Sequence, residues 1–160
     1  MKVHRLEREQ VVPRSRAEVF AFFEDAANLA RITPSFLGFR ILTPTPIEMK
    51  AGARIDYELS LFGVPLRWRT EIEVYEPKER FIDRQVRGPY RLWRHTHTFE
   101  DAPGGTRIRD RVDYAIGFGP FGRLAHHLFV RRTLERIFDH RAEIVASLFG
   151  AARPSVRVEG

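Results

Sequence analysis

The chain has 160 residues, of which 43% are hydrophobic, 12% aromatic and 30% charged, as is typical of a single folded domain with its own core. It contains no cysteine, which excludes a disulfide scaffold, thiolate zinc sites and cysteine nucleophiles. The net charge of +6 raises nucleic-acid binding as a candidate, but most arginines alternate with acidic residues, as in residues 67–73, which is typical of a solvated strand face.

The N-terminal part of the chain predicts one strand followed by two short helices. Residues 3–12 are predicted to form the strand. Ser15 is followed by Glu18 at the spacing of a capping box, which predicts a helix over residues 16–24. A second short helix is predicted over residues 26–32, because the proline that follows disfavours helix beyond it.

The middle of the chain changes to an alternation of period two. The segments with this pattern are residues 55–61, 66–74, 80–87, 90–100 and 106–116. Short turns that contain glycine or proline separate them. We therefore predict an antiparallel meander with one buried face.

The last long segment, from Gly117 to about Phe149, has helical periodicity. Its apolar stripe changes direction, which predicts a bend or break near residue 130. A strand, two short helices, about six strands and a long helix make an α+β fold, in which a curved antiparallel sheet packs on the terminal helix.

No segment resembles a targeting or anchoring sequence. The first nine residues are too charged for a signal peptide, and no later stretch is long and apolar enough to span a bilayer. We expect a cytoplasmic protein with no membrane insertion and no nucleic-acid partner, and both a monomer and a homodimer remain open. We expect one domain over residues 1–150 and a flexible tail over residues 151–160.

The second hairpin of the meander, between residues 66–74 and 80–87, places polar groups on its inward face. We expect Val74 to pair with Phe81 across the turn. The cross-strand pairs that follow are Ile72 with Asp83 and Thr70 with Gln85. Two polar side chains then face the core, where hydrophobic residues are usual.

The last hairpin has the same feature. Trp93, His95 and His97 share one face because each is two residues from the next. A register that pairs Phe99 with Thr106 sets His95 opposite Asp110, and a slip by two residues sets His97 there instead. Either register predicts an inward His–Asp pair.

These inward polar groups predict a cavity. Each buried polar group without a hydrogen bond costs about 1–3 kcal/mol, so a dry core is unfavourable and a ligand-filled or hydrated cavity is favoured. Arg141 lies on the apolar stripe of the last helix and either reaches an inward carboxylate or extends to solvent. The predicted ligand-binding residues are Tyr57, Trp68, Asp83, Gln85, Trp93, His95, His97, Asp110, Tyr114 and Arg141.

His95, His97 and Asp110 are the candidate catalytic residues. An imidazole oriented by Asp110 could transfer a proton, and a structural network is the alternative interpretation. The two histidines and Asp110 could also ligate a metal ion, but no further ligand supports such a site, so we expect neither a metal nor another cofactor. No serine has a histidine at motif spacing, and the glycines of residues 117–122 are not followed by the Lys-Ser/Thr of a phosphate loop.

Several segments resemble a known superfamily. They are residues 13–20, Asn28-Leu29, Ile32-Thr33-Pro34 and Gly88-Pro89-Tyr90, with Trp93, His95, His97 and Phe99. Over residues 3–149 the chain resembles the SRPBCC (START-like) superfamily and, within it, the bacterial polyketide cyclase/dehydrase and lipid-transport-like branch. The resemblance implies a helix-grip fold with a deep apolar cavity between the sheet and the C-terminal helix.

The function that this resemblance implies is binding of an apolar or aromatic small molecule, such as a lipid, a polyketide or a quinone-like compound. A minority of the superfamily catalyses cyclisation or dehydration. The alternative is therefore a cyclase or dehydratase that acts on a polyketide-like substrate through the inward His–Asp pair.

Overall fold

The strands of this protein form one antiparallel sheet. The computed structural model describes residues 1–61, 63–150 and 156–159. The sheet order is β2-β3-β4-β5-β6-β7-β1-β8, with antiparallel neighbours throughout. The strands are β1 (His4–Val12), β2 (Arg40–Ile41), β3 (Arg54–Leu61), β4 (Val64–Glu76), β5 (Arg80–Arg87), β6 (Leu92–Ala102), β7 (Gly105–Ala115) and β8 (Val156–Glu159).

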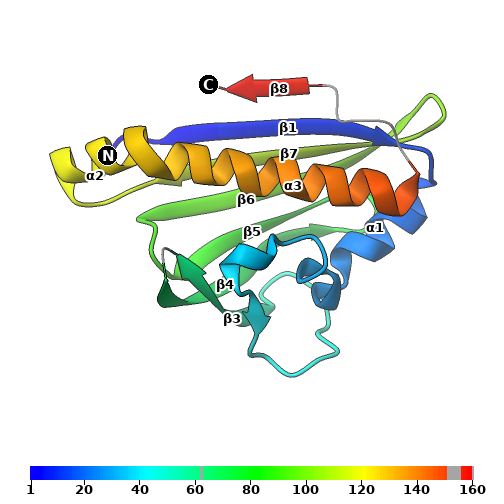
Figure 1. Ribbon diagram of the computed structural model, residues 1–160. Coiled ribbons are helices and arrows are strands. Elements are labelled where there is room, and N and C mark those ends of the chain that lie inside the picture. Colours follow the sequence, from blue (N-terminus) through cyan, green and yellow to red (C-terminus); the bar gives the residue numbers. More distant parts are fainter. Residues whose placement is uncertain (62, 151–155, 160) are drawn as a thin grey trace.

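The helices lie on one side of this sheet, and the longest of them runs alongside β1 (Figure 1). They are α1 (Arg16–Glu24), the 3-10 helices η1 (Ala26–Leu29) and η2 (Ser35–Leu37), α2 (Gly119–Ala125), the π-helical η3 (His126–Val130) and α3 (Arg131–Phe149). The predicted α+β fold, with short helices after the first strand and a long C-terminal helix, is confirmed.

The helices begin and end where local chemistry predicts, with one difference. The backbone N–H of Glu18 donates to Ser15 Oγ at 3.2 Å, so the capping residue and the bounds of α1 agree with the prediction. The predicted helix over residues 26–32 is instead the shorter η1, whose first turn is capped by Asp25. The long C-terminal helix is interrupted by η3, which is the break predicted near residue 130.

The hairpin of β4 and β5 follows the predicted register except near its turn. Ile72 pairs with Asp83 and Thr70 with Gln85, as expected. A bulge between Ile72 and Val74 shifts the next pairs by one residue, so Val74 lies opposite Ile82 and Phe81 opposite Tyr75. The predicted pairing of Val74 with Phe81 is therefore wrong, because a bulge inserts one residue into one strand only.

The last hairpin takes the second of the two predicted registers, in which His97 lies opposite Asp110. Ala102 pairs with Gly105, so Pro103 and Gly104 are the two central residues of the turn. Gly104 has φ of +80°, and a turn with proline first and a positive-φ glycine second is a type II arrangement. The glycine therefore sets the turn one residue later than a pairing of Phe99 with Thr106 requires.

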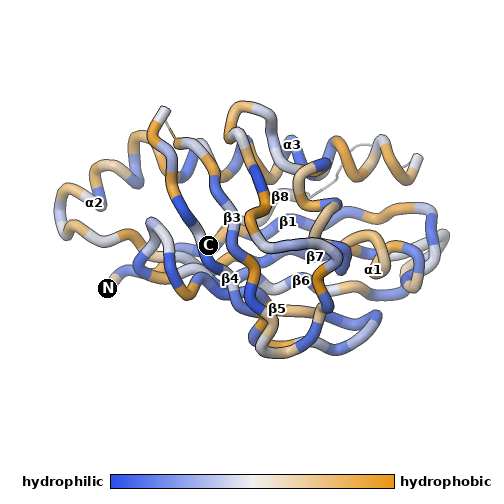
Figure 2. Tube along the Cα trace, turned by 90° about the horizontal axis from the view of Figure 1, so that it is seen from below, coloured by the Kyte–Doolittle hydropathy of each residue, from blue (hydrophilic) through white to orange (hydrophobic). Residues whose placement is uncertain are grey.

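The core is divided into two apolar clusters along the sheet. One joins α1, the inner sheet face and the end of α3, and contains Phe20, Phe99 and Val145. The other lies towards the start of α3 and contains Leu134 and Phe138. Along the strands the chain alternates between hydrophilic and hydrophobic positions (Figure 2), as expected of a sheet with one covered face.

The end of the chain differs in part from the expected flexible tail. Val156–Glu159 form β8, which pairs with β1 between Leu6 and Glu9. Residues 151–155 and 160, the rest of the expected tail, lie outside the described residues. Among the described residues, no helix is long and apolar enough to cross a membrane.

Candidate functional site

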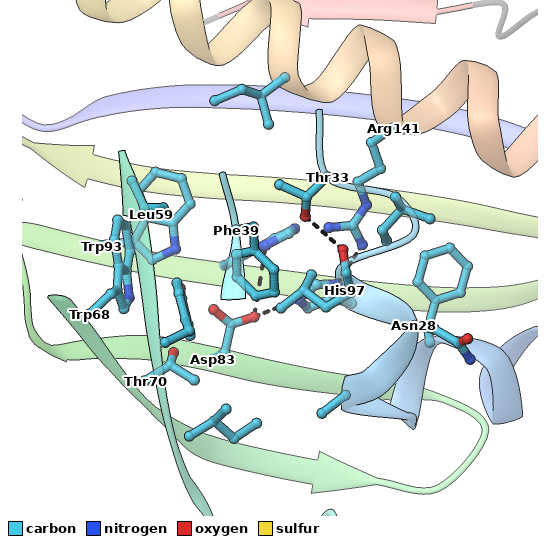
Figure 3. A pocket seen from close by; sticks show the side chains of 18 of the residues that line it. Asn28, Thr33, Phe39, Leu59, Trp68, Thr70, Asp83, Trp93, His97 and Arg141 are labelled. Carbon is cyan, nitrogen blue, oxygen red and sulfur yellow. Dashed lines mark hydrogen bonds and ion pairs between the residues drawn. The ribbon is translucent and has the colours of Figure 1, made fainter. Parts of the chain in front are cut away.

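A cavity of about 180 Å³ lies between the sheet and α3. Its lining comes from α1, η1, η2, strands β3 to β6 and α3, and most of these side chains are apolar. The ionisable side chains at its polar end come from β5, β6 and α3, and they are Asp83, His95, His97 and Arg141. In Figure 3, Asp83 and His97 point toward each other and Arg141 extends from α3 toward them.

Aromatic rings form one wall of the cavity. Tyr57 and Trp68 stack with ring centroids 5.7 Å apart, and Trp93 meets Trp68 edge-to-face at 5.2 Å. Trp68 is only 6% exposed, and its Nε1–H has no hydrogen-bond partner among the described residues. A buried donor of this kind is unfavourable unless something accepts its hydrogen bond.

The polar end of the cavity is a crossed pair of imidazole–carboxylate hydrogen bonds. His97 Nε2–H donates to Asp83 Oδ2 at 2.6 Å, and His95 Nε2–H donates to Asp110 Oδ1 at 2.8 Å. In the strand register, however, Asp83 lies opposite His95 and Asp110 opposite His97. Each carboxylate therefore bonds its diagonal neighbour, as cross-strand geometry allows.

The two imidazoles are close to each other, and the second nitrogen of each ring is also near a carboxylate. Their ring centroids are 3.6 Å apart. His95 Nδ1 is 3.8 Å from Asp83 Oδ2, and His97 Nδ1 is 3.5 Å from Asp110 Oδ1. The ligand atoms of Asp83, His95 and His97 all lie within 4.8 Å of one another, a spacing that could hold a metal ion.

Arg141 reaches the inward carboxylates, the first of the two outcomes considered from the sequence. Its Nη2 is 3.6 Å from Asp110 Oδ1 and 3.4 Å from His97 Nδ1. The guanidinium also lies over the rings of Phe23 and Phe138, at 5.3 and 5.8 Å from their centroids. Because Arg141 only donates hydrogen bonds, His97 Nδ1 is the acceptor, and this ring carries its hydrogen on Nε2.

Burial and the neighbouring charges set the ionisation of the cluster. Burial, together with the charge of His95, lowers the pKa of His97 to about 4. Burial alone would raise the pKa of Asp110, but the charge of Arg141 and the hydrogen bond from His95 hold it well below its usual range. The pKa of Asp83 is lowered as well, because the His97 hydrogen bond and the nearby charges outweigh burial. Both carboxylates are therefore ionised at pH 7.

Seven of the ten predicted ligand-binding residues line this cavity, and three do not. Gln85 instead holds the turn before β6, where its side chain bonds both the N–H and the carbonyl of Tyr90. The Tyr114 hydroxyl is hydrogen-bonded to His126 Nε2 at 2.8 Å, away from the lining. Asp110 lies behind His95 and contacts the cavity only through the imidazoles and Arg141.

Sequence reasoning missed several lining residues. Tyr90 packs on Trp93 with ring centroids 4.9 Å apart, and the Gly88-Pro89 turn that carries it was its only signal. Phe22 and Phe23 come from α1, where aromatic residues are equally typical of a filled core. Asn28 and Thr33 line the cavity from the segment around η1, and the sequence marked them only as parts of the segments that resemble the superfamily.

Comparison with solved structures shows the same fold in other proteins. A protein of Thermus thermophilus matches with a TM-score of 0.69 and 18% identity, over 90% of this chain and 98% of that one. A protein of Chromobacterium violaceum matches with a TM-score of 0.69 and 14% identity, over 92% and 98% of the two chains. The major latex-like protein 151 of Panax ginseng matches with a TM-score of 0.63 and 11% identity, over 92% and 97%.

The sequence comparison identifies the family. No curated protein matches the chain. The family described as polyketide cyclase / dehydrase and lipid transport matches residues 3–150, nearly the whole chain. The chain therefore belongs to the polyketide cyclase/dehydrase and lipid transport family of the SRPBCC superfamily, and this membership implies binding of hydrophobic ligands in general.

Proposed function

We propose that this protein binds an apolar, aromatic small molecule with a carbonyl group in the cavity between the sheet and α3. The observation that carries the proposal is the cavity itself, which has an aromatic wall and one polar end. Apolar lining with a few converging polar groups is the usual character of a small-molecule site.

The unpaired indole N–H favours one class of ligand over the others. The Trp68 side chain lines the cavity, and its buried Nε1 has no acceptor among the described residues. A shift of the indole that exposes Nε1 would let a quinone or polyketide carbonyl accept this hydrogen bond while its ring packs against Tyr57 and Trp93. A saturated lipid chain would leave the donor unpaired. The indole therefore supports a carbonyl-bearing aromatic ligand.

Organic extraction of the purified protein, followed by mass spectrometry, tests the ligand class directly. We expect a carbonyl-bearing aromatic compound in the extract, and a saturated lipid would contradict the proposal. Incubation with the identified compound adds a second result. A binding protein returns it unchanged, whereas the cyclase or dehydratase activity that the sequence also allows would convert it.

Substitution of the cavity wall tests the location of the site. Trp93→Arg places a charged side chain in the cavity, so uptake of a neutral fluorescent naphthylamine probe should be lost. Leu128→Arg is the matched control, because Leu128 is 49% exposed on η3 and outside the lining. Equal uptake by the two variants would exclude this cavity as the binding site.

The Trp68→Phe variant tests the indole donor separately from ring packing. One hydrogen bond to a neutral acceptor contributes about 1 kcal/mol, so the Kd for a naphthoquinone should rise about fivefold. The Kd for naphthalene, which has no acceptor, should change by much less. Equal changes for the two compounds would show that the ring, and not the N–H, determines binding.

A further inference from the structure

We propose that Asp83, His95 and His97 bind one divalent transition-metal ion at the polar end of the cavity. One ligand atom of each residue lies within 4.8 Å of the others. Asp83 Oδ2 is 3.8 Å from His95 Nδ1 and 2.6 Å from His97 Nε2, and we assign these three atoms as the ligands. All three residues are held by adjacent paired strands, Asp83 on β5 and both histidines on β6. This site differs from the one considered from the sequence, because Asp83 takes the place of Asp110.

The lone pairs needed for binding become available through one tautomer change. His95 already donates its Nε2–H to Asp110, so its Nδ1 is free to bind a cation. His97 donates Nε2–H to Asp83 in this structure. Moving that hydrogen to Nδ1 frees Nε2 for the metal ion and places the N–H 3.5 Å from Asp110 Oδ1. The hydrogen bond from Arg141 to Nδ1 is lost in this exchange, and Arg141 keeps its ion pair with Asp110. No proton leaves the protein in this exchange.

Asp110 then supports both metal-binding imidazoles from behind. Its Oδ1 lies 2.8 Å from His95 Nε2 and 3.5 Å from His97 Nδ1. Metal-binding histidines usually donate their second N–H to a carboxylate or carbonyl, which fixes the ring and its tautomer. Arg141 Nη2, 3.6 Å from the same oxygen, forms an ion pair with this carboxylate. One buried residue therefore orients two metal ligands.

The charges of the cluster also favour a cation. The cluster contains two carboxylates, Asp83 and Asp110, and Arg141 is the cation that pairs with Asp110. The described ion-pair contacts of Asp83 are with the two imidazoles. With neutral imidazoles the cluster carries one excess negative charge, which is unfavourable in a buried site. A divalent cation between the three ligands would offset it.

The ligand set indicates which ions fit. Two imidazole nitrogens and one carboxylate oxygen suit Zn²⁺, Fe²⁺ or Co²⁺ rather than Ca²⁺ or Mg²⁺, which prefer oxygen ligands. Three protein ligands leave at least one coordination position open. All three residues line the cavity, so the open position faces the space that a small molecule would occupy.

Titration of the full-length, chelator-treated protein with Co²⁺ tests the proposal without any organic ligand. We expect one ion per chain, visible d–d absorption bands, and quenching of tryptophan fluorescence. Quenching locates the ion, because the ring centroid of Trp93 is 6.5 Å from that of His95. If the unmodified protein does not bind Co²⁺, or binds it without quenching, the proposal is wrong. This result does not depend on the behaviour of any variant.

Conservative variants then assign the ligands. Asp110 only supports the metal-binding imidazoles, so Asp110→Asn should weaken Co²⁺ binding about 10- to 100-fold. Asp83→Asn and His95→Gln each alter a ligand and should weaken it by more than that. His126→Gln is the control, because His126 stacks on His4 in the other close histidine pair of the described chain. Unchanged binding in Asp83→Asn, or lost binding in His126→Gln, would refute the assignment.

Discussion

Replacing Arg141 by methionine tests whether the polar end of the cavity is a buried ion pair that stabilises the fold. Methionine keeps an unbranched side chain against Phe23 and Phe138 but removes the guanidinium. The Asp110 side chain, 12% exposed, then loses its cationic partner. Breaking a buried pair from one side costs about 3–5 kcal/mol.

We expect a loss near the lower end of that range, about 3 kcal/mol, because Asp110 keeps its hydrogen bond from His95. The measurement is the free energy of unfolding from urea titration followed by circular dichroism. Asp110→Asn in the Arg141→Met background should then cost less than in the parent protein, with a coupling energy of about 1–3 kcal/mol. Additive effects of the two substitutions would refute an interaction between these side chains.

Two further predictions concern the sheet and the segment before α3. A Cβ on Gly105 would lie 1.8 Å from the carbonyl oxygen of Val12, so Gly105→Ala should force β1 and β7 apart and cost about 1–3 kcal/mol in urea titration. Gly117→Ala, whose added Cβ meets no atom within 4 Å, is the control, and an equal loss there would contradict the steric explanation. Burial and the charge of His4 lower the pKa of His126 to about 4, while the unfolded chain takes up this proton near pH 6.5. The free energy of unfolding should therefore fall as the pH drops from about 6.5 to about 4. The His126→Gln variant should show a smaller fall over this pH range. An unchanged slope in the variant would show that other groups cause the pH dependence.

The strand alternation identified the residues of the polar cluster but not the contacts among them. A period of two is a property of the backbone, so the sequence placed Asp83, His95 and His97 on the inward face. It also left two registers for Asp110, and the turn at Pro103-Gly104 selects one of them. Each histidine then hydrogen-bonds the carboxylate diagonal to it, and not the one directly opposite in the register. The side-chain contacts between neighbouring strands, and not the backbone pairing alone, determine this choice.

Residues expected in the cavity but absent from its lining have a common explanation. Gln85 and Tyr114 are on the expected face of their strands, but partners at the strand ends take up their polar groups. Those partners, Tyr90 and His126, belong to a turn and a π-helical segment. Their positions depend on chain paths that no periodic pattern describes, so alternation could not predict these hydrogen bonds.

The sequence by itself determined the order of the main elements from β1 to α3, the inward face of the long strands and the presence of polar groups on that face. Those properties follow from spacing along one chain, through caps, turns and periods of two or 3.6 residues. Only the tertiary structure decided that Asp83 rather than Asp110 borders the cavity with the two histidines, and that Arg141 reaches Asp110 from α3. Those contacts join residues far apart in sequence, and they depend on how strands and helix pack in three dimensions.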